Sequence, residues 1–142
     1  MLTAAALIAV ATVIFLLATS WVRSQRAVYV VEAQIEAIRA GQVEEAYEMF
    51  SRRYRRTTSL PMFRRWLRRQ EGLTNLQHLQ FWGRSVWGQT ALLWGRFEDK
   101  LGHRYPVRYL LVREGGTWRI ERFQLATERP DPPPRSERLI KI

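Results

Sequence analysis

The first segment of the chain, LTAAALIAVATVIFLLATSWV from Leu2 to Val22, carries no formal charge. As a helix it is long enough to cross a hydrocarbon core of about 30 Å. Buried helices of soluble proteins are usually shorter and carry a polar stripe, and this segment offers only Thr and Ser. We therefore expect residues 1–24 to form a transmembrane anchor. Its lipid-facing side chains would be Leu7, Ile8, Val13, Ile14, Phe15, Leu16 and Leu17, with Trp21 at the interface.

A cleavable signal peptide is the alternative for this segment. The segment lacks a basic leading region and is long for a signal core, but Ala18, Thr19 and Ser20 are small enough for cleavage. The orientation follows from Arg23 and Arg26, because the leading flank has no basic residue. The positive-inside bias places the following domain in the cytoplasm. Long domains also translocate past such charges, so an extracytoplasmic domain stays an alternative.

Length and composition limit the size of the domain, the charge of its partners and the chemistry that it can perform. The chain has 142 residues, which leaves room for one modest core beside the anchor. Its 23 Lys and Arg against 13 Asp and Glu give a net charge of +10, which favours an anionic partner. The absence of cysteine excludes disulfides and thiolate chemistry.

The central part of the sequence reads as helices followed by strands. Helical spacing of apolar residues predicts helices over 25–40, 42–54 and 59–72, with Gly41 as a stop and Ser59 as an N-cap. Alternation then predicts strands over 78–86, 89–98, 103–113 and 117–125, joined by glycine-containing turns. We therefore expect an α+β domain over 25–125, with the helices packed on a curved, cone-like, four-stranded antiparallel sheet. Residues 126–142, rich in proline, are expected to be an extended tail.

The order of these parts resembles a known superfamily. The segments AIRAGQVEEAYEMFS, SLPMFRRWL and RYPVRYLLVREGGTWRIERFQL are similar to small bacterial membrane-anchored domains of the nuclear transport factor 2-like or cystatin-like superfamily. The resemblance covers residues 28–125. It implies a sheet curled around a helix to make a pocket, which some members use for catalysis and others for binding or dimerisation. No catalytic motif of an enzyme member can be matched onto this sequence residue by residue.

The residues suited to chemistry are few. The acids Glu98 and Asp99 fall at a hairpin end, where we expect them to be solvated, and His78 and His103 lack companions at metal-ligand spacing. The sequence therefore predicts a non-catalytic protein without metal or cofactor. Large aromatic side chains either line a pocket or fill a small core, and core filling is the preferred interpretation. These side chains are Trp66, Trp82, Trp87, Trp94, Tyr109 and Trp118.

The segment SRRYRRTTSLPMFRRWLRRQ concentrates basic charge without any acid. Like charges repel, so a surface of this kind predicts an anionic counter-surface: lipid headgroups, or subunits of a larger membrane complex. Nucleic acid is a less favoured partner, because no nucleic-acid-binding motif accompanies the charge. The residues of this arginine set are Arg52, Arg53, Arg55, Arg56, Arg64, Arg65, Arg68 and Arg69.

Together these patterns predict a single-pass membrane protein whose basic α+β domain is an accessory, assembly or scaffolding subunit of a membrane protein complex. The alternatives are a small-ligand carrier or enzyme that uses the cone pocket, and a basic nucleic-acid-binding module. A scaffold should have its interior plugged by aromatic side chains, whereas a carrier or enzyme should keep an open interior cavity with a polar group inside.

Overall fold

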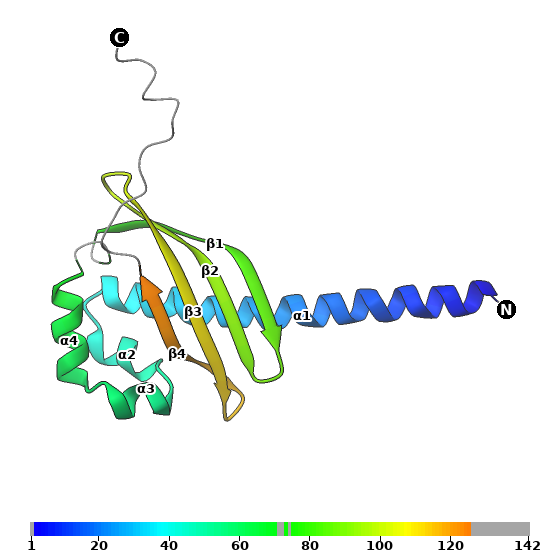
Figure 1. The fold of residues 1–142 in the computed structure, drawn as a ribbon, viewed down its shortest axis with the longest axis horizontal. Coiled ribbons are helices and arrows are strands. Elements are labelled where there is room, and N and C mark those ends of the chain that lie inside the picture. The colour runs from blue at the N-terminus through cyan, green and yellow to red at the C-terminus, as the bar shows by residue number, and fades with distance from the viewer. Residues whose placement is uncertain (1, 71–72, 74, 126–142) are drawn as a thin grey trace, which may run out of the picture.

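A computed structural model describes residues 2–70, 73 and 75–125, and the expected tail over 126–142 lies outside the described residues. One long helix, α1 (Leu2–Arg39), lies across one face of a four-stranded sheet and projects beyond it (Figure 1). Three short helices, α2 (Val43–Glu48), α3 (Arg52–Thr57) and α4 (Leu60–Arg68), lie at the end of the domain opposite to this projection. The α+β fold class is therefore confirmed.

Helix α1 has two parts with different surroundings. From Leu7 to Val22 its large apolar side chains are exposed, whereas Ala27, Val28 and Val31 are buried against the sheet. The helix expected over 25–40 is thus the continuation of the apolar segment, without a break between them. At 1.5 Å per residue the 38-residue helix is about 57 Å long.

Helix α1 ends where the sequence predicts. Gly41 has a φ of 75°, which a residue with a side chain seldom adopts. The amide of Gln42 then donates to the carbonyl of Ala37 at 2.8 Å, as in a Schellman helix stop. This turn sends the chain back along α1, where the side-chain amide of Gln34 donates to the Ala46 carbonyl at 3.0 Å.

The single helix expected over 42–54 is wrong, because the chain leaves the helical path at Phe50 and Ser51. Ser51 donates its amide to the Ile120 carbonyl at 2.9 Å, and the Ile120 amide donates to the Met49 carbonyl at 3.0 Å. The buried Ser51 side chain then caps α3 by accepting from the Tyr54 amide at 3.1 Å. Pairing with a distant strand therefore replaces one helix by α2 and α3.

Helix α4 begins at its expected N-cap, Ser59, whose side chain accepts from the Met62 amide. It is shorter than the expected 59–72 and ends at Arg68. Its buried Phe63 meets Phe50 edge to face, with ring centroids 5.1 Å apart. Aromatic rings from the helices and the sheet thus fill the interior of the domain. This aromatic cluster comprises Phe50, Tyr54, Phe63, Trp66, Tyr109 and Phe123.

The sheet is an antiparallel meander in the order β1-β2-β3-β4, as expected. Its strands are β1 (Leu76–Trp87), β2 (Thr90–Asp99), β3 (Arg104–Glu114) and β4 (Thr117–Leu125). Gly115 and Gly116 have φ values of 57° and 80°, which suit the tight turn between β3 and β4. On β3, Val107, Tyr109 and Leu111 are buried on the inner face, which faces α1.

The tryptophans and Tyr109 divide between core and surface. Trp118 and Tyr109 are buried, and Trp66 packs against the core, so core filling is confirmed for these side chains. For Trp82 and Trp87 it is wrong, because they are 59% and 56% exposed. Trp94 is half-buried and alternates with the buried Leu93 and Gly95, so it too lies on the outer face. The pairing of β1 with β2 shifts register between Phe81 and Gly83. Because of this shift, inward and outward side chains do not alternate regularly along β1, and alternation alone does not predict which of them point inward.

We expect Trp118→Ala to destabilise the fold by about 3–5 kcal/mol, because it removes a large buried side chain beside Ile120. Thermal unfolding of the full chain in mild detergent, followed by circular dichroism, measures this. The control, Trp82→Ala, removes an exposed ring and should change stability by less than about 0.5 kcal/mol. Equal losses in the two variants would contradict this assignment of the core.

Candidate functional site

The outer sheet face, which points away from α1, carries an open groove of about 450 Å³ over β2, β3 and β4. Its apolar wall comes from Leu92, Trp94 and Leu110, which alternate with buried residues of their strands. Register places Trp94 beside Arg108, and Leu110 beside Arg122. A second hollow of about 390 Å³ shares Trp94 and Arg108 and extends to Trp82.

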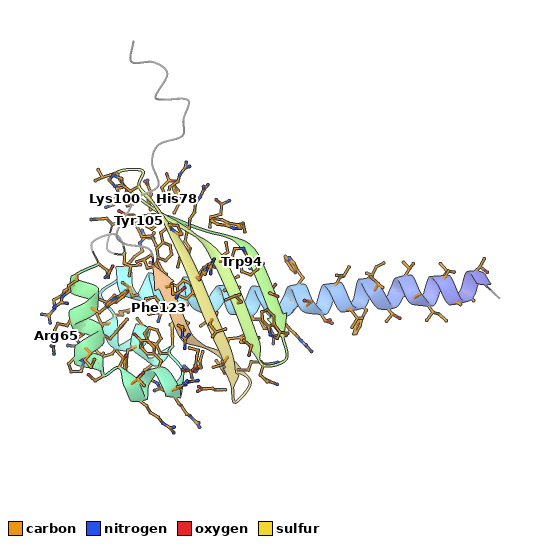
Figure 2. The ribbon with its side chains drawn as sticks, viewed as in Figure 1. Arg65, His78, Trp94, Lys100, Tyr105 and Phe123 are labelled. Carbon is orange, nitrogen blue, oxygen red and sulfur yellow. The ribbon has the colours of Figure 1, made fainter. Side chains whose placement is uncertain are left out.

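Trp94 is positioned by an unusual neighbour. Its indole ring lies where a Cβ atom at Gly83 would be, so only glycine at this position of β1 allows the ring to lie flat on the strand. Beside it, the Arg96 guanidinium lies over the Trp82 ring, 5.9 Å from the ring centre. Tryptophan and arginine side chains therefore lie next to one another on the outer face, and Figure 2 shows Trp94 on the sheet.

The charge of this face is not neutralised within the described part of the chain. Arg108 and Arg122 have no carboxylate within ion-pair distance among the described residues, whereas the nearby Arg104 pairs with Glu98 at 3.6 Å. Guanidinium groups beside exposed apolar surface suit an anion with an apolar part. The sequence contains a signal for this groove, because basic and apolar side chains share the outward positions of β2 and β3. The groove was not predicted, because the tryptophans were expected to fill the core.

Some residues of the arginine set of α3 and α4 form ion pairs with glutamates. Glutamates from distant segments pair with some of these residues: Glu114 with Arg52, Glu121 with Arg53, and Glu44 with Arg64. The prediction of an acid-free surface missed these contacts, because the acids come from α2, β3 and β4. Within the described residues, no ion pair involves the remaining members, Arg55, Arg56, Arg65, Arg68 and Arg69. Arg55 is half-buried, and its buried Nε lacks a hydrogen-bond partner there.

Helix α4 lies far along α1 from the apolar segment. A hollow of about 560 Å³ is lined by Ile38 of α1 together with Arg64 and Arg68 of α4. Ile38 is about 24 Å beyond Val22 at 1.5 Å per residue. Figure 2 shows Arg65 on the side of the domain opposite to the projecting part of α1. The arginines of α4 therefore form the end of the domain that is most distant from the apolar segment.

A polar cluster forms at the turn between β2 and β3. The Asp99 carboxylate accepts from the amides of Leu101 and His103, both at 2.9 Å, and from the Tyr105 hydroxyl at 3.1 Å. The His103 ring nitrogen Nδ1 lies 3.0 Å from the same carboxylate. The expectation that Asp99 is solvated is wrong, because it is only 6% exposed. Burial opposes its ionisation, but the hydrogen bonds from His103, Leu101 and Tyr105 outweigh this effect and lower the pKa of Asp99.

The hydrogen bonds of this cluster stabilise the turn between β2 and β3. Its carboxylate oxygens are occupied by two backbone amides, a ring nitrogen and a hydroxyl, so they stabilise the reversal of the chain. Figure 2 shows Tyr105, His78 and Lys100 at this same end of the sheet. In the described ranges, no group of three or more His, Asp and Glu side chains is arranged to hold a metal ion.

A protein-family comparison identifies the domain. The model described as Domain of unknown function (DUF4864) matches residues 23–132, which is most of the chain. The chain belongs to the DUF4864 family. The match begins at Arg23, directly after the uncharged segment, so the DUF4864 domain comprises the second part of α1, the short helices and the sheet. No curated protein matches the chain.

We expect Asp99→Asn to destabilise the fold at neutral pH. The folded-state pKa of Asp99 lies below its ordinary value of 3.8, so the ionised carboxylate stabilises the fold above that pH. This contribution is lost as the pH falls through the lowered pKa. Denaturant unfolding of both proteins in detergent across the acid range should show their difference shrinking towards zero. A difference that is constant with pH would show that the charge of Asp99 is not what stabilises the turn.

Proposed function

We propose that this DUF4864 protein is a non-catalytic, single-pass membrane protein whose basic domain is an accessory or scaffolding subunit of a membrane protein complex. The observation that carries the proposal is the contrast between the two sheet faces. The inner face is filled by α1 and the aromatic cluster, whereas the outer face presents tryptophan and arginines that form no ion pair within the described part of the chain. Tryptophan and arginine are enriched among the residues that dominate binding energy at protein interfaces.

The filled interior supports a scaffold more than an enzyme or carrier that uses a cone pocket. Phe50, Phe63 and Tyr109 are nearly inaccessible, and their rings contact further aromatic side chains. Burial raises the pKa of Tyr109 above its ordinary value, so this buried phenol stays neutral at physiological pH. A sheet wrapped over a helix also supports membership of the nuclear transport factor 2-like superfamily, which we retain as part of the proposal.

Membrane anchoring is supported by the exposure of the first part of α1. One helix of the described chain is long and apolar enough to cross a membrane, and its most apolar window has no buried residue. A signal sequence would pass the same test. The helical backbone is continuous from this part into the core, where α1 covers the sheet from Ala27 onward.

The position of α4 helps to choose between the two anionic partners of the arginine set. The α4 arginines lie near Ile38, about 24 Å along α1 from the end of the apolar segment. Surface charges interact only weakly beyond a screening length of about 8–10 Å at physiological salt. An acidic face of a neighbouring subunit is therefore a better partner for Arg65 and Arg68 than the headgroups of the bilayer that α1 would cross.

A second candidate function is favoured by the groove on the outer sheet face. A groove of about 450 Å³ with an apolar wall and the guanidinium groups of Arg108 and Arg122 has the size and character of a small-ligand site. It would take a small anion with an apolar body. In this case the domain would be a carrier that binds on its outer face.

We expect the intact chain to stay in the membrane pellet after carbonate or high-salt washing and to keep its amino terminus. The physical reason is that the apolar side chains of this part of α1 are not buried within the protein, so transfer from water into the hydrocarbon core of a bilayer is favourable for them. Fractionation followed by amino-terminal sequencing measures both properties. A washed-out protein, or a mature chain that begins near Ser20, would show that the segment is a cleaved signal.

We expect that removing arginine charge from the surface by which this protein contacts its partner releases the partner protein from the complex, as purified in mild detergent. The test compares two double variants, Arg65→Gln with Arg68→Gln, and Arg108→Gln with Arg122→Gln. The matched control is Arg52→Gln with Arg53→Gln, which removes the same charge from residues that already pair with glutamates. Stability should change by less than about 0.5 kcal/mol per substitution in the two test pairs.

The outcomes separate the candidate functions. At least one test pair should lose a stoichiometric partner protein that the control retains. If the outer-face pair instead abolishes binding of a small amphipathic anion, measured by calorimetry, the carrier function replaces the scaffold. Retention of the partner by all variants would contradict the proposed surfaces.

A further inference from the structure

The domain begins directly at the end of the apolar segment, without a linker. Ser24 is already buried, at 6% exposed, and Ala27 is inaccessible. The Ser24 hydroxyl donates to the Trp21 carbonyl at 2.7 Å, so the helical path is regular through this junction. If α1 crosses a bilayer up to Val22, the surface of the domain that surrounds the exit of α1 must lie in or on the headgroup layer.

A single contact identifies which part of the sheet lies at this level. The Arg84 guanidinium of β1 donates to the Gln25 side-chain oxygen of α1 at 2.8 Å. Gln25 is about 4.5 Å beyond Val22 along the helix. From Arg84, β1 continues to Trp87 and the turn at Gly88, and this β1–β2 hairpin lies on the side of the domain from which α1 projects (Figure 1).

The side chains near this level have the character of a membrane interface. Trp87 at the hairpin end is 56% exposed and Trp21 of α1 is 63% exposed, and neither packs against the core. Tryptophan is enriched at the boundary between hydrocarbon and headgroups. Arg23, Arg26 and Arg84 are also exposed, and they add positive charge at the height of lipid phosphates.

We propose that the β1–β2 hairpin docks on the bilayer, with Trp87 in the interfacial layer and Arg23, Arg26 and Arg84 against anionic headgroups. The inference rests on the membrane anchoring of α1 proposed above and adds a second point of attachment. Two attachment points fix the rotation of the domain about α1, which one helix alone leaves free. The hairpin, and not the arginine set of α3 and α4, is therefore the lipid-binding part of the domain.

The test uses the full chain reconstituted into vesicles whose acyl chains carry bromine near the headgroup end, which quenches nearby tryptophan. We compare the quenching of the parent chain with that of Trp87→Phe, Trp82→Phe and Trp21→Phe. Trp82 is the matched control, because it lies on the same strand with a similar exposure of 59%. It is about 16 Å farther along β1 at 3.3 Å per residue.

Trp87→Phe and Trp21→Phe should each lose part of the bromolipid quenching, whereas Trp82→Phe should lose none. A loss in Trp21→Phe without a loss in Trp87→Phe would overturn the docking of the hairpin while leaving the anchor intact. No loss in either variant would overturn both. Equal losses for Trp82 and Trp87 would also overturn the proposal, because the sheet would then lie flat on the bilayer.

A second comparison tests the charge. Replacing part of the neutral lipid by anionic phosphatidylglycerol should increase the quenching of Trp87, and high salt should reverse this increase. Arg26→Gln should reduce the increase, whereas the charge-matched Arg65→Gln at the opposite end of the domain should not. An increase that is insensitive to Arg26→Gln, or that Arg65→Gln removes, would overturn the headgroup role of the arginines at the exit of α1.

Discussion

The fold depends on one uninterrupted helical backbone that changes its environment at Ser24. Before this residue the large apolar side chains of α1 are exposed, and after it Ala27, Val28 and Val31 form the floor on which the sheet packs. An α-helix is stiff over this length, so a segment that spans a bilayer would also determine the height of every strand. The exposed apolar part of α1 and the part that packs in the core are thus one continuous helix.

The basic side chains lie in separate groups on different parts of the domain. Arg84 is held near Gln25 at the start of the core, while Arg64 and Arg68 lie beside Ile38 near the far end of α1. Arg108 and Arg122 lie on the outer face of the sheet. Because screening limits each surface charge to a range of about 8–10 Å, one anionic surface would not reach all of these groups. A net charge of +10 therefore does not identify one anionic surface.

Much of the fold could be predicted because its signals are local. Gly41 and the Gly115–Gly116 turn act through their own backbone, Ser59 caps the helix that follows it, and alternation in β4 predicted its bounds correctly. The break at Ser51 could not be predicted, because it depends on hydrogen bonds to Ile120 in a strand far along the chain. The outward positions of β2 and β3 could be read from alternation, but the register shift in β1 and the packing of Trp94 on Gly83 could not, because both are tertiary features.

The continuity of α1 can be measured directly, because the chain has no cysteine and spin labels can be placed freely. Leu7→Cys and Tyr29→Cys replace side chains that are 71% and 70% exposed, on either side of the junction at Ser24. In lipid nanodiscs, a single rigid helix predicts a narrow distance distribution near about 33 Å between the labelled backbone positions. A broad distribution, or one centred at a clearly shorter distance, would show a hinge between anchor and domain and would contradict this account.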